Sequence, residues 1–133
     1  MYTGSCHCKN IKFKITGDVV PTIPPLVCYC DHCAKFSGSV GGIIAVYKPE
    51  DISFEGEMTV YTDKTSDSGQ DKTVHFCGKC GCLIYSQPQS FGDLICIRSP
   101  LIDGEFPAEL YPQLELYPEK KPKYMELNSL KKE

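Results

Sequence analysis

The chain has 133 residues, a formal net charge of −3 and a hydrophobic fraction of 41%, which excludes a disordered chain and allows one hydrophobic core. Of its 14 basic residues only Arg98 is an arginine, which argues against nucleic-acid partners, because their binding proteins usually carry a basic, Arg-rich face. No stretch has the layout of a signal peptide or a membrane-spanning helix, so we expect an intracellular, cytoplasmic protein with no membrane partner.

Short strands dominate the secondary structure that the sequence predicts. Residues 11–16 alternate apolar and polar side chains with the period of two that a half-buried strand requires. Six later segments rich in β-branched or aromatic residues are also predicted strands: 42–47, 59–62, 72–76, 83–86, 94–98 and 114–117. Helix is predicted only as one turn at 34–37 and a short terminal helix at 124–131, and the polar residues 65–71 are predicted as an exposed loop. The sequence thus predicts one mainly β domain over residues 1–133.

Nine cysteines are the unusual feature of this composition, and eight of them fall into three tight clusters. The clusters are Cys6 with Cys8, then Cys28 with Cys30 and Cys33, and then Cys77 with Cys80 and Cys82. A secreted disulfide framework normally has an even count, wider spacing and an export signal, and the sequence shows none of these. The clusters therefore predict metal binding.

The pair Cys77 and Cys80 has the layout of a zinc knuckle, in which a tight turn brings two thiolates onto one ion. Backbone N–H groups of such a turn point at the sulfurs and offset their negative charge. Cys6 and Cys8 can supply the two missing ligands, because residues i and i+2 of an extended segment project from the same face. Spacing alone leaves the pairing open, since either terminal cluster could instead complete the central one. A closed four-thiolate site would staple the chain ends to the sheet.

The central cluster offers three thiolates from six residues, Cys28 to Cys33. Three protein ligands and one exchangeable position are typical of catalytic zinc. The alternative is a second closed site, whose fourth ligand would be Cys82, Cys96, His32 or a carboxylate. Three sulfur donors weaken zinc as a Lewis acid for water, yet such an ion can hold an incoming thiol as a nucleophilic thiolate. The site is therefore suited to adding a thiol to a small carbonyl electrophile, or to the reverse cleavage.

Three motifs, taken in chain order, resemble the glutathione-dependent formaldehyde-activating enzyme family. They are Gly4-x-Cys6-x-Cys8, then Cys28-x-Cys30-x-x-Cys33 followed by Phe36-Ser37-Gly38-Ser39, and then Phe76-Cys77-x-x-Cys80-Gly81. Leu101-Ile102-Asp103 and the closing segments 112–117 and 121–124 extend the resemblance over roughly the whole chain.

The resemblance implies an Mss4-like β-tent of short antiparallel strands stapled by two zinc ions. By position, the structural ion would be held by Cys6, Cys8, Cys77 and Cys80, and the catalytic, labile one by Cys28, Cys30 and Cys33. The implied activity is that of a carbon–sulfur lyase, which forms S-(hydroxymethyl)glutathione from glutathione and formaldehyde or cleaves it. The same fold is also used by binding proteins, so a non-catalytic zinc-stapled interaction module is an alternative. A metal or redox buffer is a third, and it predicts a disulfide between Cys33 and Cys82.

Glutathione carries two carboxylates, so its pocket should offer cations or backbone donors. Arg98, Lys35 and Lys79 are candidates, and His32, inside the central cluster, could shuttle a proton or serve as the fourth ligand. Cys82 stands outside the family's ligand positions and can be a core residue, a spare ligand or a redox thiol. Cys96, between aliphatic neighbours, is expected to be buried and inert. The sequence leaves a homo-oligomer open.

Overall fold

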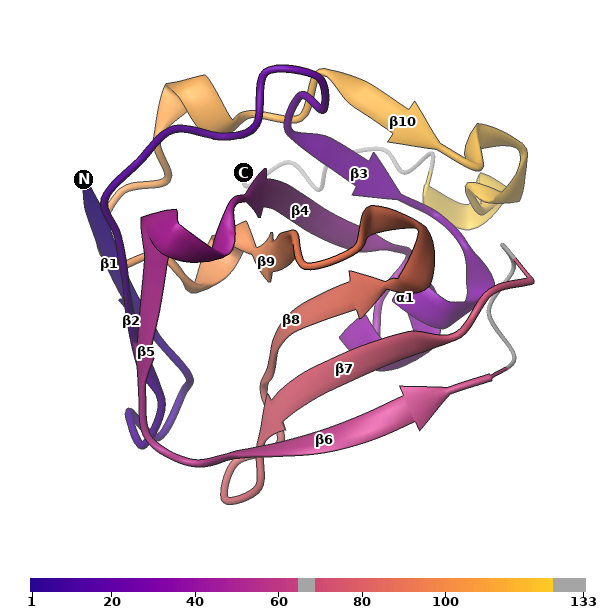
Figure 1. Cartoon of the computed structure of the whole chain (residues 1–133). Coiled ribbons are helices and arrows are strands. Elements are labelled where there is room, and N and C mark those ends of the chain that lie inside the picture. Colours follow the sequence, from indigo (N-terminus) through magenta and orange to yellow (C-terminus); the bar gives the residue numbers. More distant parts are fainter. Residues whose placement is uncertain (65–68, 126–133) are drawn as a thin grey trace, which may run out of the picture.

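The computed structural model describes residues 1–64 and 69–125 as two β-sheets and one short α-helix (Figure 1). The smaller sheet has the order β1-β2-β5, with strands β1 (Tyr2–Ser5), β2 (Lys12–Ile15) and β5 (Ile52–Glu55). The larger sheet has the order β10-β3-β4-β9-β8-β7-β6. Its strands are β3 (Leu26–Cys28), β4 (Gly42–Tyr47), β6 (Met58–Asp63), β7 (Lys72–Cys77), β8 (Leu83–Pro88), β9 (Ile95–Arg98) and β10 (Leu114–Leu116).

The helical content is small. Helix α1 (Asp31–Ser37) follows β3 directly and returns the chain to β4. Six single turns of 3-10 helix connect other elements: Pro49–Asp51, Gln89–Phe91, Ser99–Leu101, Ala108–Leu110, Pro118–Lys120 and Lys123–Met125. Within the described residues, none of the helices has the length and apolar character needed to cross a membrane.

The mainly β prediction is confirmed, and each of the seven predicted strands has a counterpart. Three strands, β1, β3 and β5, were not predicted, and α1 is longer than the single turn expected at 34–37. One strand pair departs from the antiparallel pattern, because β10 runs parallel to β3. The expected terminal helix at 124–131 lies mostly outside the described residues, as does most of the expected loop at 65–71.

Burial explains why the strands form where they do. In β2, Phe13 and Ile15 are buried while Lys12 and Lys14 are exposed, the alternation of a sheet with one solvated face. By contrast, β4 and β9 at the centre of the larger sheet are buried almost throughout, because both faces are covered.

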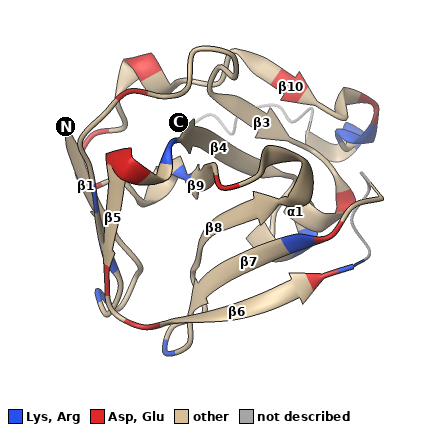
Figure 2. Ribbon diagram, viewed as in Figure 1, with Lys and Arg blue, Asp and Glu red and all other residues tan. Residues whose placement is uncertain are grey.

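Two clusters of apolar side chains cover these two faces. One fills the space between the sheets and includes Ile15, Tyr47 and Ile97. The other lies on the opposite face and includes Leu26, Ile44 and Val46, together with the central cysteines. The central cysteines therefore sit inside the core. Charged residues are scattered over loops and strand ends in the view of Figure 2.

Candidate metal centres

The structure brings the first and last cysteine clusters together. The sulfurs of four residues lie within 4.8 Å of one another: Cys6, Cys8, Cys77 and Cys80. This is the pairing that the resemblance implies and that spacing alone left open. Four sulfur donors without an oxygen donor are a set that zinc binds as a closed tetrahedral site, so the group fits a zinc ion.

The knuckle forms where β7 ends. The backbone N–H groups of Lys79 and Cys80 each donate to the Cys77 sulfur at 3.4 Å, as the sequence predicted. Gly81 has φ +79°, a left-handed conformation that favours glycine, and its N–H donates to the Cys77 carbonyl at 2.8 Å. Hydrogen bonds from the backbone of Cys8 and Cys82 lower the pKa of the Cys80 thiol to about 5. Local backbone donors thus favour thiolates at this turn.

Cys6 and Cys8 converge for a different reason from the one predicted. They lie in a turn after β1, not on an extended segment. The Lys9 N–H donates to the Cys6 carbonyl at 3.1 Å, and Lys9 has φ +65°. The two sulfurs are 3.6 Å apart, and the Ile11 N–H donates to the Cys6 sulfur at 3.3 Å. The i, i+2 argument was therefore wrong about the backbone, and this segment resembles the knuckle that it faces.

The central cluster is built from the end of β3 and the start of α1. Cys28 ends the strand, Cys30 is the N-cap of the helix, and Cys33 lies in its first turn, with all three sulfurs within 4.8 Å. The Cys30 sulfur accepts the Cys33 N–H at 3.3 Å, as a capping side chain does. All three residues are buried. The short helix thus folds two thiols back toward the strand that carries the third.

The pKa values of Cys33 and Cys28 are shifted in opposite directions. Hydrogen bonds from Cys28 and Cys30, followed by the positive charge of Arg98, lower the pKa of the Cys33 thiol. The pKa of Cys28 is raised, because its thiol shares those hydrogen bonds with Cys30 and Cys33.

Three buried soft donors fit a zinc ion with one further position. Among the described residues, no other Cys, His, Asp or Glu ligand atom joins this group.

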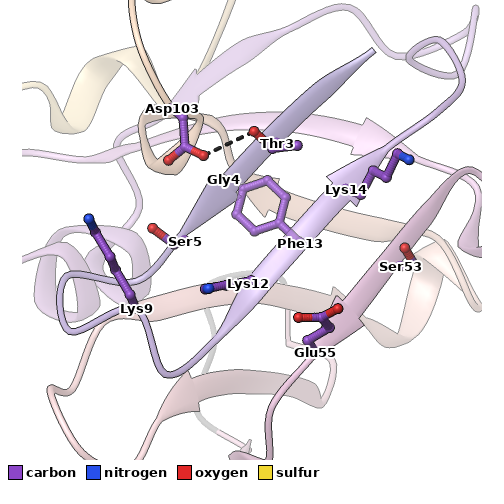
Figure 3. Close-up of a pocket in the computed structure, with 10 residues that line it drawn as sticks. All are labelled: Thr3, Gly4, Ser5, Lys9, Lys12, Phe13, Lys14, Ser53, Glu55 and Asp103. Atoms are coloured by element: carbon purple, nitrogen blue, oxygen red, sulfur yellow. Dashed lines mark hydrogen bonds between the residues drawn. The ribbon is translucent and has the colours of Figure 1, made fainter.

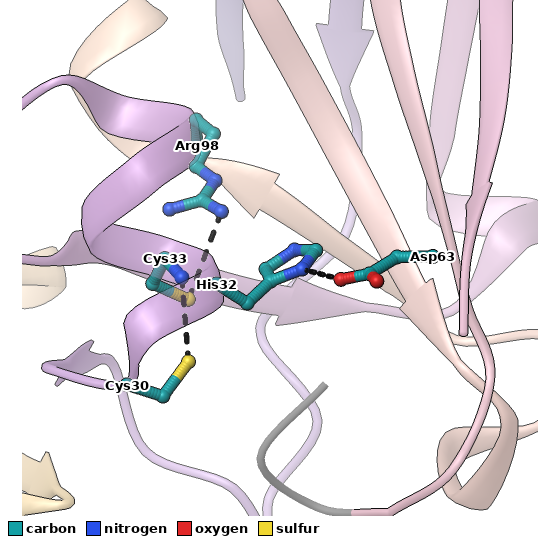
Figure 4. Close-up of polar contacts among 5 residues, drawn as sticks. All are labelled: Cys30, His32, Cys33, Asp63 and Arg98. Atoms are coloured by element: carbon teal, nitrogen blue, oxygen red, sulfur yellow. Dashed lines mark hydrogen bonds and ion pairs between the residues drawn. The ribbon is translucent and has the colours of Figure 1, made fainter. Parts of the chain in front are cut away.

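His32 lies in α1, and its ring forms a hydrogen bond with a side chain of strand β6. Its Nδ1–H donates to the carboxylate of Asp63, at the end of β6 (Figure 4). Burial lowers the pKa of His32, so the ring is neutral near pH 7 and Nε2 carries a lone pair. Nε2 is buried and has no hydrogen-bond partner among the described residues. Sequence reasoning missed Asp63, although an acidic residue directly after the predicted strand 59–62 was a usable signal.

Arg98 and Lys35, both candidate substrate contacts, line different cavities. Arg98 borders a cleft of about 470 Å³ that also exposes Phe36, Ile43 and Cys82. Lys35 and His32 border a second cavity of about 300 Å³. Phe36 lies on both, so the two cavities flank helix α1. Lys79 lines neither of them.

The two remaining cysteines behave differently. Cys96, in β9, is buried, and this burial raises the pKa of its thiol to about 12. The thiol is therefore protonated at neutral pH, in line with an inert residue. Cys82 is half-buried beside the closed cluster and lies outside the group of four sulfurs. Its sulfur accepts the His7 N–H at 3.4 Å, which ties the knuckle to the Cys6 turn.

A further cavity of about 500 Å³ lies on the smaller sheet (Figure 3). Lys9, Lys12 and Lys14 share its lining with Glu55 and Asp103, and Asp103 accepts a hydrogen bond from Thr3 at 3.0 Å. None of its lining residues is a cysteine or a histidine. It therefore offers no group suited to the thiol chemistry of the clusters.

Comparisons with known proteins identify a similar fold and a family. A crystal structure of a Rhodobacter sphaeroides protein is similar in fold, with a TM-score of 0.64, 18% sequence identity, and coverage of 86% of this chain and 98% of that chain. No curated protein matches the sequence. The family described as glutathione-dependent formaldehyde-activating enzyme matches residues 1–120, which include both cysteine groups. The chain therefore belongs to the glutathione-dependent formaldehyde-activating enzyme family.

Proposed function

We propose that this protein is a zinc-dependent carbon–sulfur lyase that interconverts S-(hydroxymethyl)glutathione with glutathione and formaldehyde. The observation that carries the proposal is the central cluster, where three buried thiols converge without a fourth ligand from the described residues. A closed cluster, like the one at the knuckle, would leave no position for a substrate. Membership of the family supplies glutathione and formaldehyde as the reactants to test first.

The two clusters would hold two zinc ions with different roles. Cys28, Cys30 and Cys33 would hold the catalytic ion, and Cys6, Cys8, Cys77 and Cys80 the structural one. When bound, the catalytic ion supplies an open position that stabilises a thiol in its thiolate form. The remaining roles fall to protein side chains.

Binding of glutathione is assigned to the two cavities that flank α1. Arg98 borders one and Lys35 the other, so each offers a cation to one of the two carboxylates of glutathione. Phe36 borders both cavities, so a ligand that reaches from one cavity to the other would pass over its side chain.

His32 is proposed to move the proton of the reaction. In the cleavage direction the hydroxyl proton of the adduct passes to a base, the carbon–oxygen double bond forms, and the carbon–sulfur bond breaks with its electron pair going to sulfur. Nε2 of His32 has the lone pair that this base requires, because Nδ1–H is held by Asp63. The products are formaldehyde, the glutathione thiolate and protonated His32, so atoms and charge balance.

Cys30→Ser tests this assignment. We expect it to abolish turnover while the fold and one bound zinc remain, since Cys30 belongs only to the central group. Turnover is followed by NMR with labelled formaldehyde and glutathione, and zinc is counted by atomic absorption. Cys96→Ser, outside both groups and outside the lining of both cavities, is the matched control. A wild-type rate in Cys30→Ser would refute the assignment, and a wild-type protein with two zinc ions but no turnover would favour an interaction module.

A further inference from the structure

A buried cation, Arg98, contacts the central cysteine cluster. Arg98, at the end of β9, is only 7% exposed, and its Nη2 donates to the Cys33 sulfur at 3.8 Å (Figure 4). Burying a guanidinium is unfavourable unless a negative charge compensates it. The guanidinium is therefore positioned to interact with the negative charge of the cluster and not with solvent.

Gly42 makes room for this guanidinium. A Cβ at position 42 would lie 1.6 Å from Nη1 of Arg98, so any side chain there would displace the guanidinium. Gly42 pairs with Cys28 across strands β4 and β3, so the guanidinium lies over the strand next to a second cysteine of the cluster. The backbone of Gly42 lies in an ordinary strand without a positive φ, so the feature that favours glycine here is the close approach of Arg98.

Two donors of Arg98 still lack a partner. Nε and Nη1 are buried and have no hydrogen-bond acceptor among the described residues. Buried charged donors left unsatisfied are costly, so a nearby anion would stabilise them. The cleft that Arg98 borders has no acidic residue in its lining, which leaves this place open to an anionic ligand.

We propose that Arg98 is the positioning residue that sets the charge of the central cluster and thereby makes it accept an anionic thiolate. A divalent ion held by three thiolates has a net charge of about −1, which Arg98 brings to about zero. A fourth ligand that is a thiolate then brings the local charge from about zero to only about −1. Without Arg98 the same ligand would produce about −2 in a buried site, where repulsion is poorly screened. That the cluster accepts a thiolate rests on the proposed function, whereas the effect of Arg98 on the charge of the cluster does not.

The test measures metal binding and thiol binding separately. Arg98→Met removes the charge and keeps an apolar stem, and we expect the metal affinity of the central site to fall on the order of 10–100-fold. Competition with a chelator gives this affinity. Cobalt-substituted protein reports the binding of 2-mercaptoethanol, a thiol without a carboxylate, through its sulfur-to-metal absorption band. Arg98→Lys should recover part of both affinities, which a merely structural role would not explain. Lys12→Met, an exposed cation on the smaller sheet, is the matched control and should leave both unchanged.

Gly42→Ala keeps the charge but displaces the guanidinium, so it should lower the central metal affinity in the same direction. In the Arg98→Met background, the same change should have little further effect. If Arg98→Met folds poorly, the metal affinity of the single variant Gly42→Ala decides whether the guanidinium has the charge role. Equal metal affinity in wild type, Arg98→Met and Gly42→Ala would overturn the charge role. If Arg98→Met lowers metal affinity but not thiol affinity, the thiolate role is refuted, whereas a wild-type protein that binds no thiol would count against the proposed function.

Discussion

Removal of the Asp63 carboxylate should weaken the link between strand β6 and helix α1. Asp63 is 4% exposed and accepts the Nδ1–H of His32, whose Nε2 already lacks a partner among the described residues. In Asp63→Ala the Nδ1–H loses its acceptor, so neither ring nitrogen of the buried imidazole keeps a partner shown among the described residues. Because burial keeps His32 neutral, the relevant scale is a hydrogen bond to a charged acceptor, about 1.5–3 kcal/mol, and not the larger cost of a broken ion pair.

Asp63→Asn separates the two contributions of this side chain. The amide oxygen can still accept the Nδ1–H, while the negative charge is lost, so we expect a smaller cost of about 0.5–1.5 kcal/mol. Thr62→Ala, at the exposed preceding position, is the matched control and should change stability by less than about 0.5 kcal/mol. Urea unfolding of the zinc-loaded proteins, monitored by circular dichroism at pH 7.5, gives the free energy of unfolding of each variant relative to the wild type. An Asp63→Ala cost no larger than that of Thr62→Ala would refute the reasoning.

The same contact has a dependence on pH with a definite sign. Burial lowers the pKa of His32 in the folded protein, so below about 6.5, the ordinary value, the unfolded chain takes up the proton more readily. The contribution of His32 to stability is therefore present above that pH and lost as the pH falls below it. Asp63→Asn should steepen this loss between pH 7.5 and 6.0, because the carboxylate that opposes the lowered pKa is gone.

Two further predictions concern single positions. Burial raises the pKa of the Cys96 thiol to about 12, so Cys96 should resist iodoacetamide at pH 8 in the folded protein and react only after unfolding. Mass spectrometry reads the labelling, and fast labelling of Cys96 in the native chain would contradict its burial. Gly38→Ala should destabilise the protein by about 1 kcal/mol in urea unfolding, because Gly38 ends α1 at φ +64° in open space; an unchanged midpoint would mean that the helix end does not need the left-handed conformation.

Local sequence patterns were sufficient for some of these features. The alternation in β2 and the β-branched run of β4 predict strands because a side chain's burial depends on its own strand's period. The knuckle at Cys77 and Cys80 was also predictable, since its backbone donors come from residues within the same turn. Strand β1, the four residues Tyr2–Ser5, shows no such pattern and exists because β2 pairs with it. Strand β3 has only three residues, and β4 and β10 hold it on either side.

The sequence by itself thus determined the mainly β class and the three groups of cysteines that lie close along the chain. Spacing left open whether Cys6 and Cys8 meet the knuckle near Cys77, and the tertiary structure brings them together as the family resemblance implied. Only the tertiary structure showed that Asp63 accepts a hydrogen bond from His32 and that Arg98 reaches Cys33. The residues joined by these contacts are 31 or more positions apart in the sequence. Spacing constrains side chains only within a few residues, whereas such distant pairs are set by the strand order and by which sheet face each side chain occupies.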